Sequence, residues 1–200
     1  INHIIKANKK IFSIYPGSRL SEINVLIPIF FEFIKKMNEN YKDFFFVFHS
    51  TKEHVQLIQN LLIKEGAKNC EAIADEKIKS HILKSSIFAL AKSGTISLEI
   101  CNAKVPSIIV YKMGFINFFI IKMLVKVKFA NIINIAANEE VIPELIQSKC
   151  NSKNIYNNVD KLLSNRQALK KQVAKSQSII SNFKTKNSSK IASLVLLDYL

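Results

Sequence analysis

The sequence predicts an α/β fold in which helices cover both faces of a parallel sheet. As far as Tyr111, short apolar runs alternate with amphipathic stretches of helical period. The apolar runs lack the alternation of a strand that faces water, so they are typical of strands buried on both faces. Two of the four glycines, Gly17 and Gly94, follow such runs where a helix begins. Strands that alternate with helices pair in parallel, and the pattern is Rossmann-like.

The first strand and helix carry the clearest signals. Ile11–Tyr15 is an apolar run that ends at Pro16-Gly17, and Ser21–Met37 has apolar residues at helical spacing. Ser21 is the expected N-cap of this helix, and Pro28 inside it predicts a kink or a later start. Further strands are expected at Asp43–His49, Cys70–Ala74, Ile87–Ala91 and Pro106–Tyr111, and the helices between them at Lys52–Glu65, Glu76–Lys84 and Thr95–Asn102.

Beyond Lys112 the sequence predicts helices. Phe115–Val127 carries phenylalanines and lysines on one face. Such a face suits a lipid headgroup layer, and it suits equally a core helix whose lysines extend to solvent. The remaining helices are expected at Glu140–Gln147, Ile155–Leu163, Gln167–Phe183 and Ile191–Leu200.

The composition narrows the classes of partner. Hydrophobic residues make up 48% of the chain, enough for a sizeable core, and the formal net charge is +14. A cationic chain can bind an anionic membrane surface, but a solvated lysine-rich face also explains the charge. Nucleic acid is not expected as a partner, because lysine is spread along the chain and Arg19 and Arg166 are the only arginines.

Several kinds of site are not supported by the sequence. The three cysteines and four histidines show no metal-ligand spacing, and His49 and His54 are expected on the surface or in the core. The patterns GxxxxGKS/T, GxSxG and GxGxxG do not occur. We therefore expect no metal and no cofactor. No apolar run is long enough to cross a bilayer, and the start at Ile1 suggests a fragment of a longer protein.

Two strand-to-helix crossings carry the candidate site. In Pro16-Gly17-Ser18-Arg19, the glycine permits close backbone approach, the helix N-terminus offers free N–H groups, and the arginine suits phosphate oxygens. Ser93-Gly94-Thr95 repeats the pattern after another strand. Glu99 follows one helical turn later, where a carboxylate can accept the hydroxyls of a ribose. Each crossing also has a plainer interpretation. The first can be an ordinary strand-to-helix turn with an exposed Arg19, and Glu99 can be a capping or surface glutamate.

A family resemblance rests on four segments that occur in order: YPGSRLSEI, KSGTISLEI, VPSIIVYK and NIINIAANEEVIPELIQ. From about Phe12 to Gln147, the chain resembles the lipid-A-disaccharide synthases. The resemblance implies the C-terminal, donor-binding half of an inverting glycosyltransferase with two Rossmann-like domains. Such an enzyme transfers 2,3-diacylglucosamine from UDP-2,3-diacylglucosamine to the lipid acceptor 2,3-diacylglucosamine 1-phosphate and releases UDP. It also implies a bacterial cytoplasmic protein, peripheral on the anionic inner face of the inner membrane.

The resemblance also implies which residues contact the donor. By this match, Gly17, Ser18 and Arg19 contact the phosphates, Ser93, Gly94 and Thr95 line the nucleotide pocket, Glu99 holds the ribose, and Asn134 lies beside the diphosphate or the sugar.

The chain departs from the family pattern in one segment. Where the family has Pro, Gly and Arg, this sequence has Ile133, Asn138 and Glu139. The exchange of arginine for Glu139 removes a cation near the expected diphosphate, so it is expected to weaken donor binding. Asn138 can still adopt the left-handed turn conformation that glycine favours.

The resemblance divides the chain into two parts. Residues 1–165 are expected to form the UDP-sugar-binding domain, and residues 166–200 a helical tail that packs on the family's N-terminal domain. That domain has no counterpart here and is expected to supply the general base. The catalytic residues are therefore unknown, and the chain is expected to be inactive without an N-terminal half on another chain. The alternatives are a UDP-sugar transferase half with another acceptor, and a non-catalytic basic remnant that binds a membrane or a partner.

Overall fold

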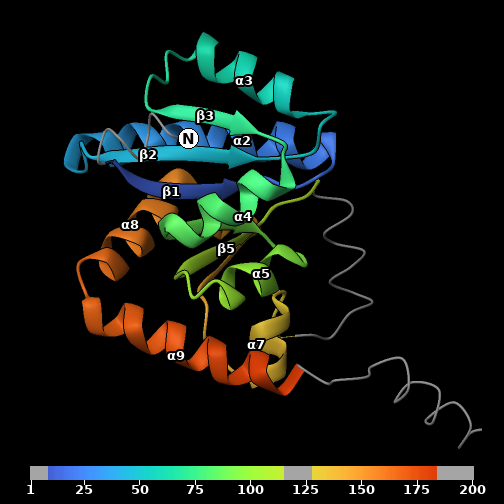
Figure 1. Ribbon diagram of the computed structural model, residues 1–200, viewed down its shortest axis with the longest axis vertical. Coiled ribbons are helices and arrows are strands. Elements are labelled where there is room, and N and C mark those ends of the chain that lie inside the picture. The colour runs from blue at the N-terminus through green and yellow to red at the C-terminus, as the bar shows by residue number, and fades with distance from the viewer. Residues whose placement is uncertain (1–8, 115–127, 184–200) are drawn as a thin grey trace, which may run out of the picture.

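The computed structural model describes residues 9–114 and 128–183, and within them six strands form one parallel sheet (Figure 1). The strand order is β3-β2-β1-β4-β5-β6. The strands are β1 (Lys10–Tyr15), β2 (Phe44–His49), β3 (Cys70–Ile73), β4 (Ser86–Lys92), β5 (Ser107–Tyr111) and β6 (Glu144–Ile146). The helices are α2 (Leu20–Asn40), α3 (Val55–Lys64), α4 (Glu76–Ser85), α5 (Ile96–Asn102), α7 (Ile132–Ala137), α8 (Ser152–Leu163) and α9 (Arg166–Phe183), with a 3₁₀ turn η1 (Gln147–Lys149). The predicted Rossmann-like parallel sheet is confirmed.

Helices cover both faces of the sheet, as its apolar strands predict. Figure 1 shows α4 and α5 in front of the strands, and the core residues of α2 and α8 pack on the opposite face. Successive residues of β4 alternate between the two sides. Phe88 and Leu90 belong to the cluster beneath α2 and α8, whereas Ala89 and Ala91 belong to the cluster beneath α5. Both sets are fully buried, which is why β4 reads as a continuous apolar run.

Phe12 of β1 lies at the centre of the larger cluster. Its side chain is fully buried, and its ring lies 5.3 Å from the ring of Phe46, 5.3 Å from Phe88 and 5.6 Å from Phe33. These residues come from β1, β2, β4 and α2, so one aromatic ring joins the three central strands to the helix that covers them. Aromatic pairs at such distances add to the stabilisation from buried area alone.

Helix α2 differs from the prediction at its start. It begins at Leu20, and Arg19 occupies the N-cap position without a side-chain hydrogen bond. Ser21 is therefore inside the helix, and its predicted role as N-cap is wrong. Pro28 does not delay the start either, because the helix runs through it to Asn40. Eight buried apolar residues of α2 outweigh the backbone hydrogen bond that proline removes.

The helix predicted at Glu140–Gln147 is wrong. This segment instead contains β6, which pairs in parallel with β5 at Val110↔Leu145, and the start of η1. Pro143 precedes the strand and its carbonyl accepts the Ile109 N–H at 3.0 Å. A proline without an N–H is poorly placed inside a helix but can lie beside an edge strand. The short helix α7 was not predicted, and Asn131 caps it by accepting the Ile133 N–H at 2.8 Å.

Helix α9 belongs to the predicted tail, and it packs on this chain. Gln172 is buried, donates to the Ser107 carbonyl at 3.0 Å and accepts the Ser107 N–H at 2.8 Å. Gln177 donates to the Cys101 carbonyl at the end of α5. The described part of the tail is therefore joined to β5 and α5. Packing of the tail against a second domain stays a prediction.

Three predicted segments, Phe115–Val127, Ile191–Leu200 and the residues around Ile1, lie outside the described residues. Among the helices of residues 9–114 and 128–183, none has both the length and the apolar character needed to cross a membrane.

The position of Phe12 gives a test of the fold. Phe12→Ala is expected to lower the free energy of unfolding by about 3–5 kcal/mol, because it removes a buried ring and leaves a cavity. Urea denaturation followed by circular dichroism measures the change. Ile63→Ala is the matched control, since this side chain is 68% exposed and its removal is expected to change stability by less than about 0.5 kcal/mol. Similar losses in the two variants would contradict the central role of Phe12.

Candidate nucleotide site

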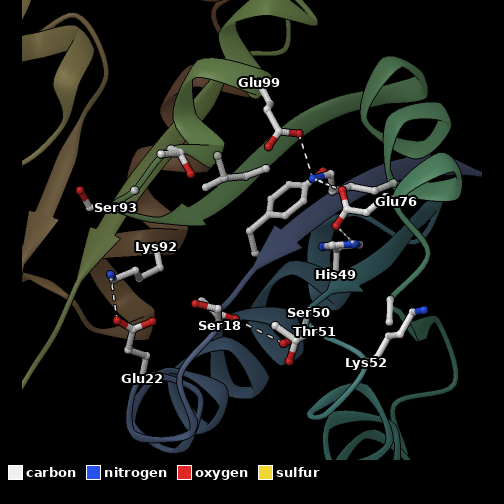
Figure 2. Close-up of a pocket in the computed structure, with 17 residues that line it drawn as sticks. Ser18, Glu22, His49, Ser50, Thr51, Lys52, Glu76, Lys92, Ser93 and Glu99 are labelled. Atoms are coloured by element: carbon white, nitrogen blue, oxygen red, sulfur yellow. Dashed lines mark hydrogen bonds and ion pairs between the residues drawn. The ribbon is translucent and has the colours of Figure 1, made fainter.

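A pocket of about 420 Å³ lies at the carboxyl ends of the parallel strands (Figure 2). Segments that follow four different strands line it. These segments contribute Gly17 and Ser18 after β1, Ser50, Thr51 and Lys52 after β2, Ala74 and Glu76 after β3, and Ser93, Gly94 and Thr95 after β4. Ligands of open α/β sheets bind at this edge, and the volume is in the range of small-molecule sites.

The structure brings six of the eight predicted site residues together. Gly17, Ser18, Ser93, Gly94, Thr95 and Glu99 all line the pocket. Arg19 lies next to this lining, with its side chain 77% exposed and its guanidinium 3.3 Å from the Glu22 carboxylate. An exposed arginine beside the pocket is compatible with contact to a phosphate.

Asn134 is the predicted residue that the structure places elsewhere. It is fully buried; its amide donates to the Ile142 carbonyl at 2.7 Å and to Glu144 at 2.8 Å. Its oxygen accepts the N–H groups of Val141 and Ile142. These bonds fold the segment that leads from α7 to β6. A contact of Asn134 with a diphosphate or sugar stays a prediction.

The side chain of Glu22 leaves no room for any residue larger than glycine at position 17. The φ of Gly17 is +107°, and a Cβ at this position would collide with the Glu22 side chain. Glu22 is only 14% exposed and lies 2.9 Å from the ammonium of Lys92. Burial works against ionisation of Glu22, but the hydrogen bond and the charge of Lys92 outweigh it and keep its pKa below the usual value. The glycine turn after β1 is thus held to the end of β4.

Lys92 is a pocket residue that sequence reasoning missed. Its ammonium lies 2.9 Å from Glu22 and 5.1 Å from the centre of the Tyr111 ring. The signal in the sequence is a lysine at the end of an otherwise apolar strand, directly before Ser93-Gly94. Lys92 is the last residue of β4, so it lies at the sheet edge where the pocket is, and it lines that pocket.

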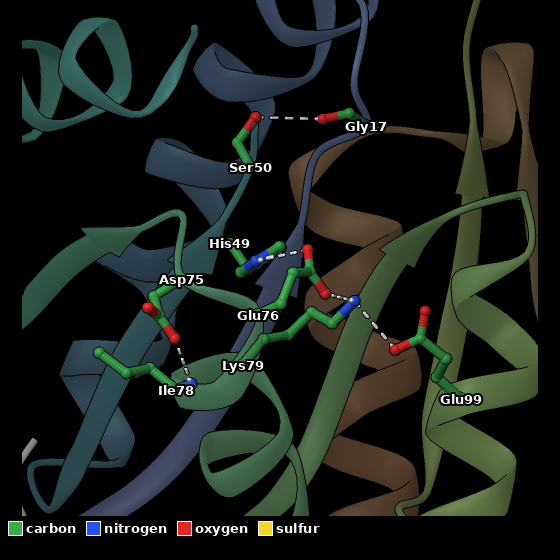
Figure 3. Close-up of polar contacts among 8 residues, drawn as sticks. All are labelled: Gly17, His49, Ser50, Asp75, Glu76, Ile78, Lys79 and Glu99. Carbon is green, nitrogen blue, oxygen red and sulfur yellow. Dashed lines mark hydrogen bonds and ion pairs between the residues drawn. The ribbon is translucent and has the colours of Figure 1, made fainter. Parts of the chain in front are cut away.

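A second set of charged side chains crosses the pocket from β2 to α5 (Figure 3). His49 Nε2 lies 3.5 Å from Glu76, Glu76 lies 2.5 Å from Lys79, and Lys79 lies 2.9 Å from Glu99. The hydrogen bond from Lys79 lowers the pKa of Glu76. Burial works against the charge on Lys79, yet Glu76 and Glu99 together raise its pKa. Sequence reasoning found only Glu99 in this set.

Three residues that line the pocket each have a buried polar atom without a hydrogen-bond partner in the described part of the chain. These atoms are Tyr15 Oη, His49 Nε2 and Thr51 Oγ1. The 3.5 Å approach of His49 to Glu76 does not have the geometry of a hydrogen bond. Burial lowers the pKa of His49, which favours the neutral ring. Unpaired buried polar groups each cost about 1–3 kcal/mol, so these atoms lower the stability of the fold beside the pocket.

The departures from the family pattern also have a place in the structure. Asn138 has a φ of +52°, which confirms the left-handed conformation expected for it. Glu139 lies 2.5 Å from the ammonium of Lys175 on α9. The negative charge of Glu139 is therefore balanced by a lysine of the same chain.

Across residues 9–114 and 128–183, no three His, Cys, Asp or Glu side chains gather as a metal site would require.

The pair of Lys92 and Glu22 gives a pH-dependent test. Lys92→Met removes the closer and more enclosed of the two cations beside the Glu22 carboxylate and leaves only the exposed Arg19. The change is expected to cost about 2 kcal/mol of unfolding free energy after solvent screening is considered. Lys92 keeps the pKa of Glu22 low, so its stabilisation is present above the usual pKa of a glutamate and is lost as the pH falls through the lowered value. Urea denaturation is thus expected to give a larger cost at about pH 7 than at about pH 4.

The control for this test is Lys35→Met, which removes an exposed lysine that pairs with Glu32 and Glu65. It is expected to change stability little at either pH. An equal cost of Lys92→Met at both pH values would show that the pair with Glu22 does not stabilise the fold.

Comparison with known proteins identifies close relatives of this sequence. A family model of lipid-A-disaccharide synthetase matches residues 2–197. The lipid-A-disaccharide synthase of Rickettsia prowazekii is 35% identical over 176 residues, which cover 88% of this chain and 46% of that protein. The enzyme of a Sulfurihydrogenibium species is 32% identical over 176 residues, which cover 84% of this chain and 45% of that protein. The chain spans about half the length of the curated relatives it matches.

Solved structures resemble the fold at low sequence identity. The UDP-GlcNAc 2-epimerase of Neisseria meningitidis bound to UDP-GlcNAc matches with a TM-score of 0.65 and 17% identity, over 98% of this chain and 48% of that chain. The C-terminal domain of a group 1 family glycosyltransferase from Francisella tularensis matches with a TM-score of 0.58 and 13% identity, over 86% of this chain and 85% of that chain. Since the family model covers nearly the whole sequence, this chain belongs to the lipid-A-disaccharide synthase family of glycosyltransferases.

Proposed function

We propose that this chain binds the UDP part of UDP-2,3-diacylglucosamine and forms the donor half of a lipid-A-disaccharide synthase. One observation carries the proposal. Gly17 follows β1, Gly94 follows β4 and Glu99 lies on α5, yet all three line one pocket. The two glycine turns present backbone N–H groups for a diphosphate. Glu99 lies on α5, where its carboxylate can accept two ribose hydroxyls.

Two cations of the pocket suit the diphosphate of a nucleotide, because Lys52 lines the pocket and Arg19 lies at its side. Lys79 and Lys92 also line the pocket, but Glu76 and Glu99 compensate the charge of Lys79, and Glu22 compensates that of Lys92. In an inverting transfer, the acceptor hydroxyl attacks the anomeric carbon as the bond to the diphosphate oxygen breaks. UDP leaves with the bonding electron pair, so negative charge grows on the phosphates. Donors that already point at this position stabilise the growing charge.

The proton of the acceptor hydroxyl requires a base, and the pocket carboxylates are poorly suited to this role. Glu22 pairs with Lys92, and Glu76 and Glu99 pair with Lys79. The pKa values of Glu22 and Glu76 are lowered, which makes both weaker bases. We therefore assign the base to the part of the enzyme that corresponds to the other half of the relatives' length. The lipid acceptor and the anionic membrane surface belong to the same proposal.

UDP binding is the direct test. A concentration of UDP about 100-fold above its Kd is expected to raise the melting temperature by roughly 5–10 °C. Glu99→Ala removes the acceptor for the ribose hydroxyls and is expected to weaken UDP binding by about 10- to 100-fold. Calorimetric titration and thermal unfolding measure both effects. Glu39→Ala, an exposed glutamate on α2, is the control and is expected to bind UDP like the parent chain.

The outcomes separate the candidate functions. A chain that ignores millimolar UDP but binds anionic vesicles in a salt-sensitive way would favour a non-catalytic membrane or partner role. UDP binding would support a UDP-sugar transferase half but would not identify its acceptor. Activity assays with different acceptors, made with the N-terminal half added, distinguish the lipid acceptor from another one.

The need for a second half can be tested by activity. The chain alone is expected to form no disaccharide from UDP-2,3-diacylglucosamine and the lipid acceptor, because the base is absent from its pocket. Addition of the N-terminal half of a Rickettsia relative is expected to produce UDP release, measured by a coupled assay. The same mixture made with Glu99→Ala is the control for a site on this chain. Turnover by the chain alone would overturn this assignment of the base.

A further inference from the structure

Lys79 is a nearly buried lysine that lies between two carboxylates of the pocket. Its side chain is 11% exposed, and its ammonium lies 2.5 Å from Glu76 and 2.9 Å from Glu99. Glu76 comes from the first turn of α4 and Glu99 from α5, so the lysine joins two helices that follow different strands (Figure 3). The start of α4 is itself fixed, because Asp75 accepts the Ile78 N–H at 2.8 Å.

We propose that Lys79 is a positioning residue that holds the Glu99 carboxylate in place for the ribose of the nucleotide. The inference rests on the proposed function. Glu99 is 48% exposed, and a glutamate at a pocket mouth is free to change rotamer unless another group restrains it. Lys79 contacts Oε2 of Glu99, which leaves Oε1 and the remaining lone pairs to accept ribose hydroxyls.

The charge balance argues that Lys79 acts through Glu99 and does not serve as a phosphate ligand. Two carboxylates lie within 2.9 Å of its ammonium, so its charge is compensated before any ligand binds. Glu76 is 70% exposed and keeps Lys79 directed across the pocket from the side opposite to Glu99. A restrained carboxylate loses less conformational entropy on binding, which favours affinity through pre-organisation.

The experiment compares two ligands that differ only at the ribose. UDP and 2′,3′-dideoxy-UDP are titrated calorimetrically into the parent chain and into Lys79→Met. We expect Lys79→Met to weaken UDP binding by about 5- to 10-fold and to change dideoxy-UDP binding by less than about 2-fold. Lys79→Arg keeps a cation between the carboxylates and is expected to restore most of the UDP affinity. In a Glu99→Gln background, Lys79→Met is expected to have no further effect.

Lys77→Met is the matched control, because it removes an exposed lysine from the same helix. It is expected to leave both dissociation constants unchanged. Circular dichroism and thermal unfolding without ligand establish that each variant is folded. If Lys79→Met does not fold, Glu76→Gln tests the same arrangement, since it removes the second anchor of Lys79. It is expected to weaken UDP selectively and by a smaller factor.

Each other outcome overturns the inference. Equal weakening of both ligands would mean that Lys79 supports the pocket as a whole or contacts the phosphates. Unchanged UDP affinity would mean that Glu99 needs no restraint, and tighter UDP binding would mean that Lys79 competes with the ribose. A parent chain that binds no UDP would fail at the first titration. That result would overturn the proposed function itself, and it is distinguishable from the others.

Discussion

Parallel strand pairing is the constraint on which the pocket depends. In a parallel sheet every strand ends at the same edge, so the segments after β1, β2, β3 and β4 meet there although they are far apart in the sequence. The register is fixed by burial on both faces, because a slip by one residue would move large side chains to the wrong layer. Phe12 shows this most directly, since its ring packs against β2, β4 and α2 together. The core therefore determines where the site residues lie.

The pocket edge is held together by charge compensation between loops. Lys92 and Glu22 join the end of β4 to the first turn of α2, and Lys79 joins α4 to α5 through Glu99. Glu22, Lys92 and Lys79 are largely enclosed, so their charges depend on their partners much more than those of an exposed pair do, whereas Glu99 is 48% exposed. In the donor complex that we propose, the diphosphate is therefore recognised mainly by backbone N–H groups, by Arg19 and by Lys52. The strongly basic composition of the chain is thus only a partial guide to its binding site.

The sequence was sufficient to predict the parts of the site that depend on local rules. Gly17 and Gly94 mark strand-to-helix turns, and such turns share one edge once the strands are known to be parallel. Lys79 and His49 were not predicted as pocket residues, because their position depends on how α4 sits on the sheet and no local pattern reports that. The error at Glu140–Gln147 has a similar origin. Its apolar spacing fits a short helix, and only pairing with β5 makes it an edge strand.

The exchange of arginine for Glu139 illustrates how a departure from a family pattern depends on its surroundings. Taken alone, a carboxylate in place of a cation is unfavourable for a bound diphosphate. In the folded chain it lies 2.5 Å from Lys175 of α9, which is itself joined to β5 by Gln172. Helix α9 therefore supplies a positive charge beside the carboxylate that stands where the family has arginine. Glu139 and Lys175 together carry no net charge, so the exchange removes the positive charge of the arginine but leaves no uncompensated negative charge in its place.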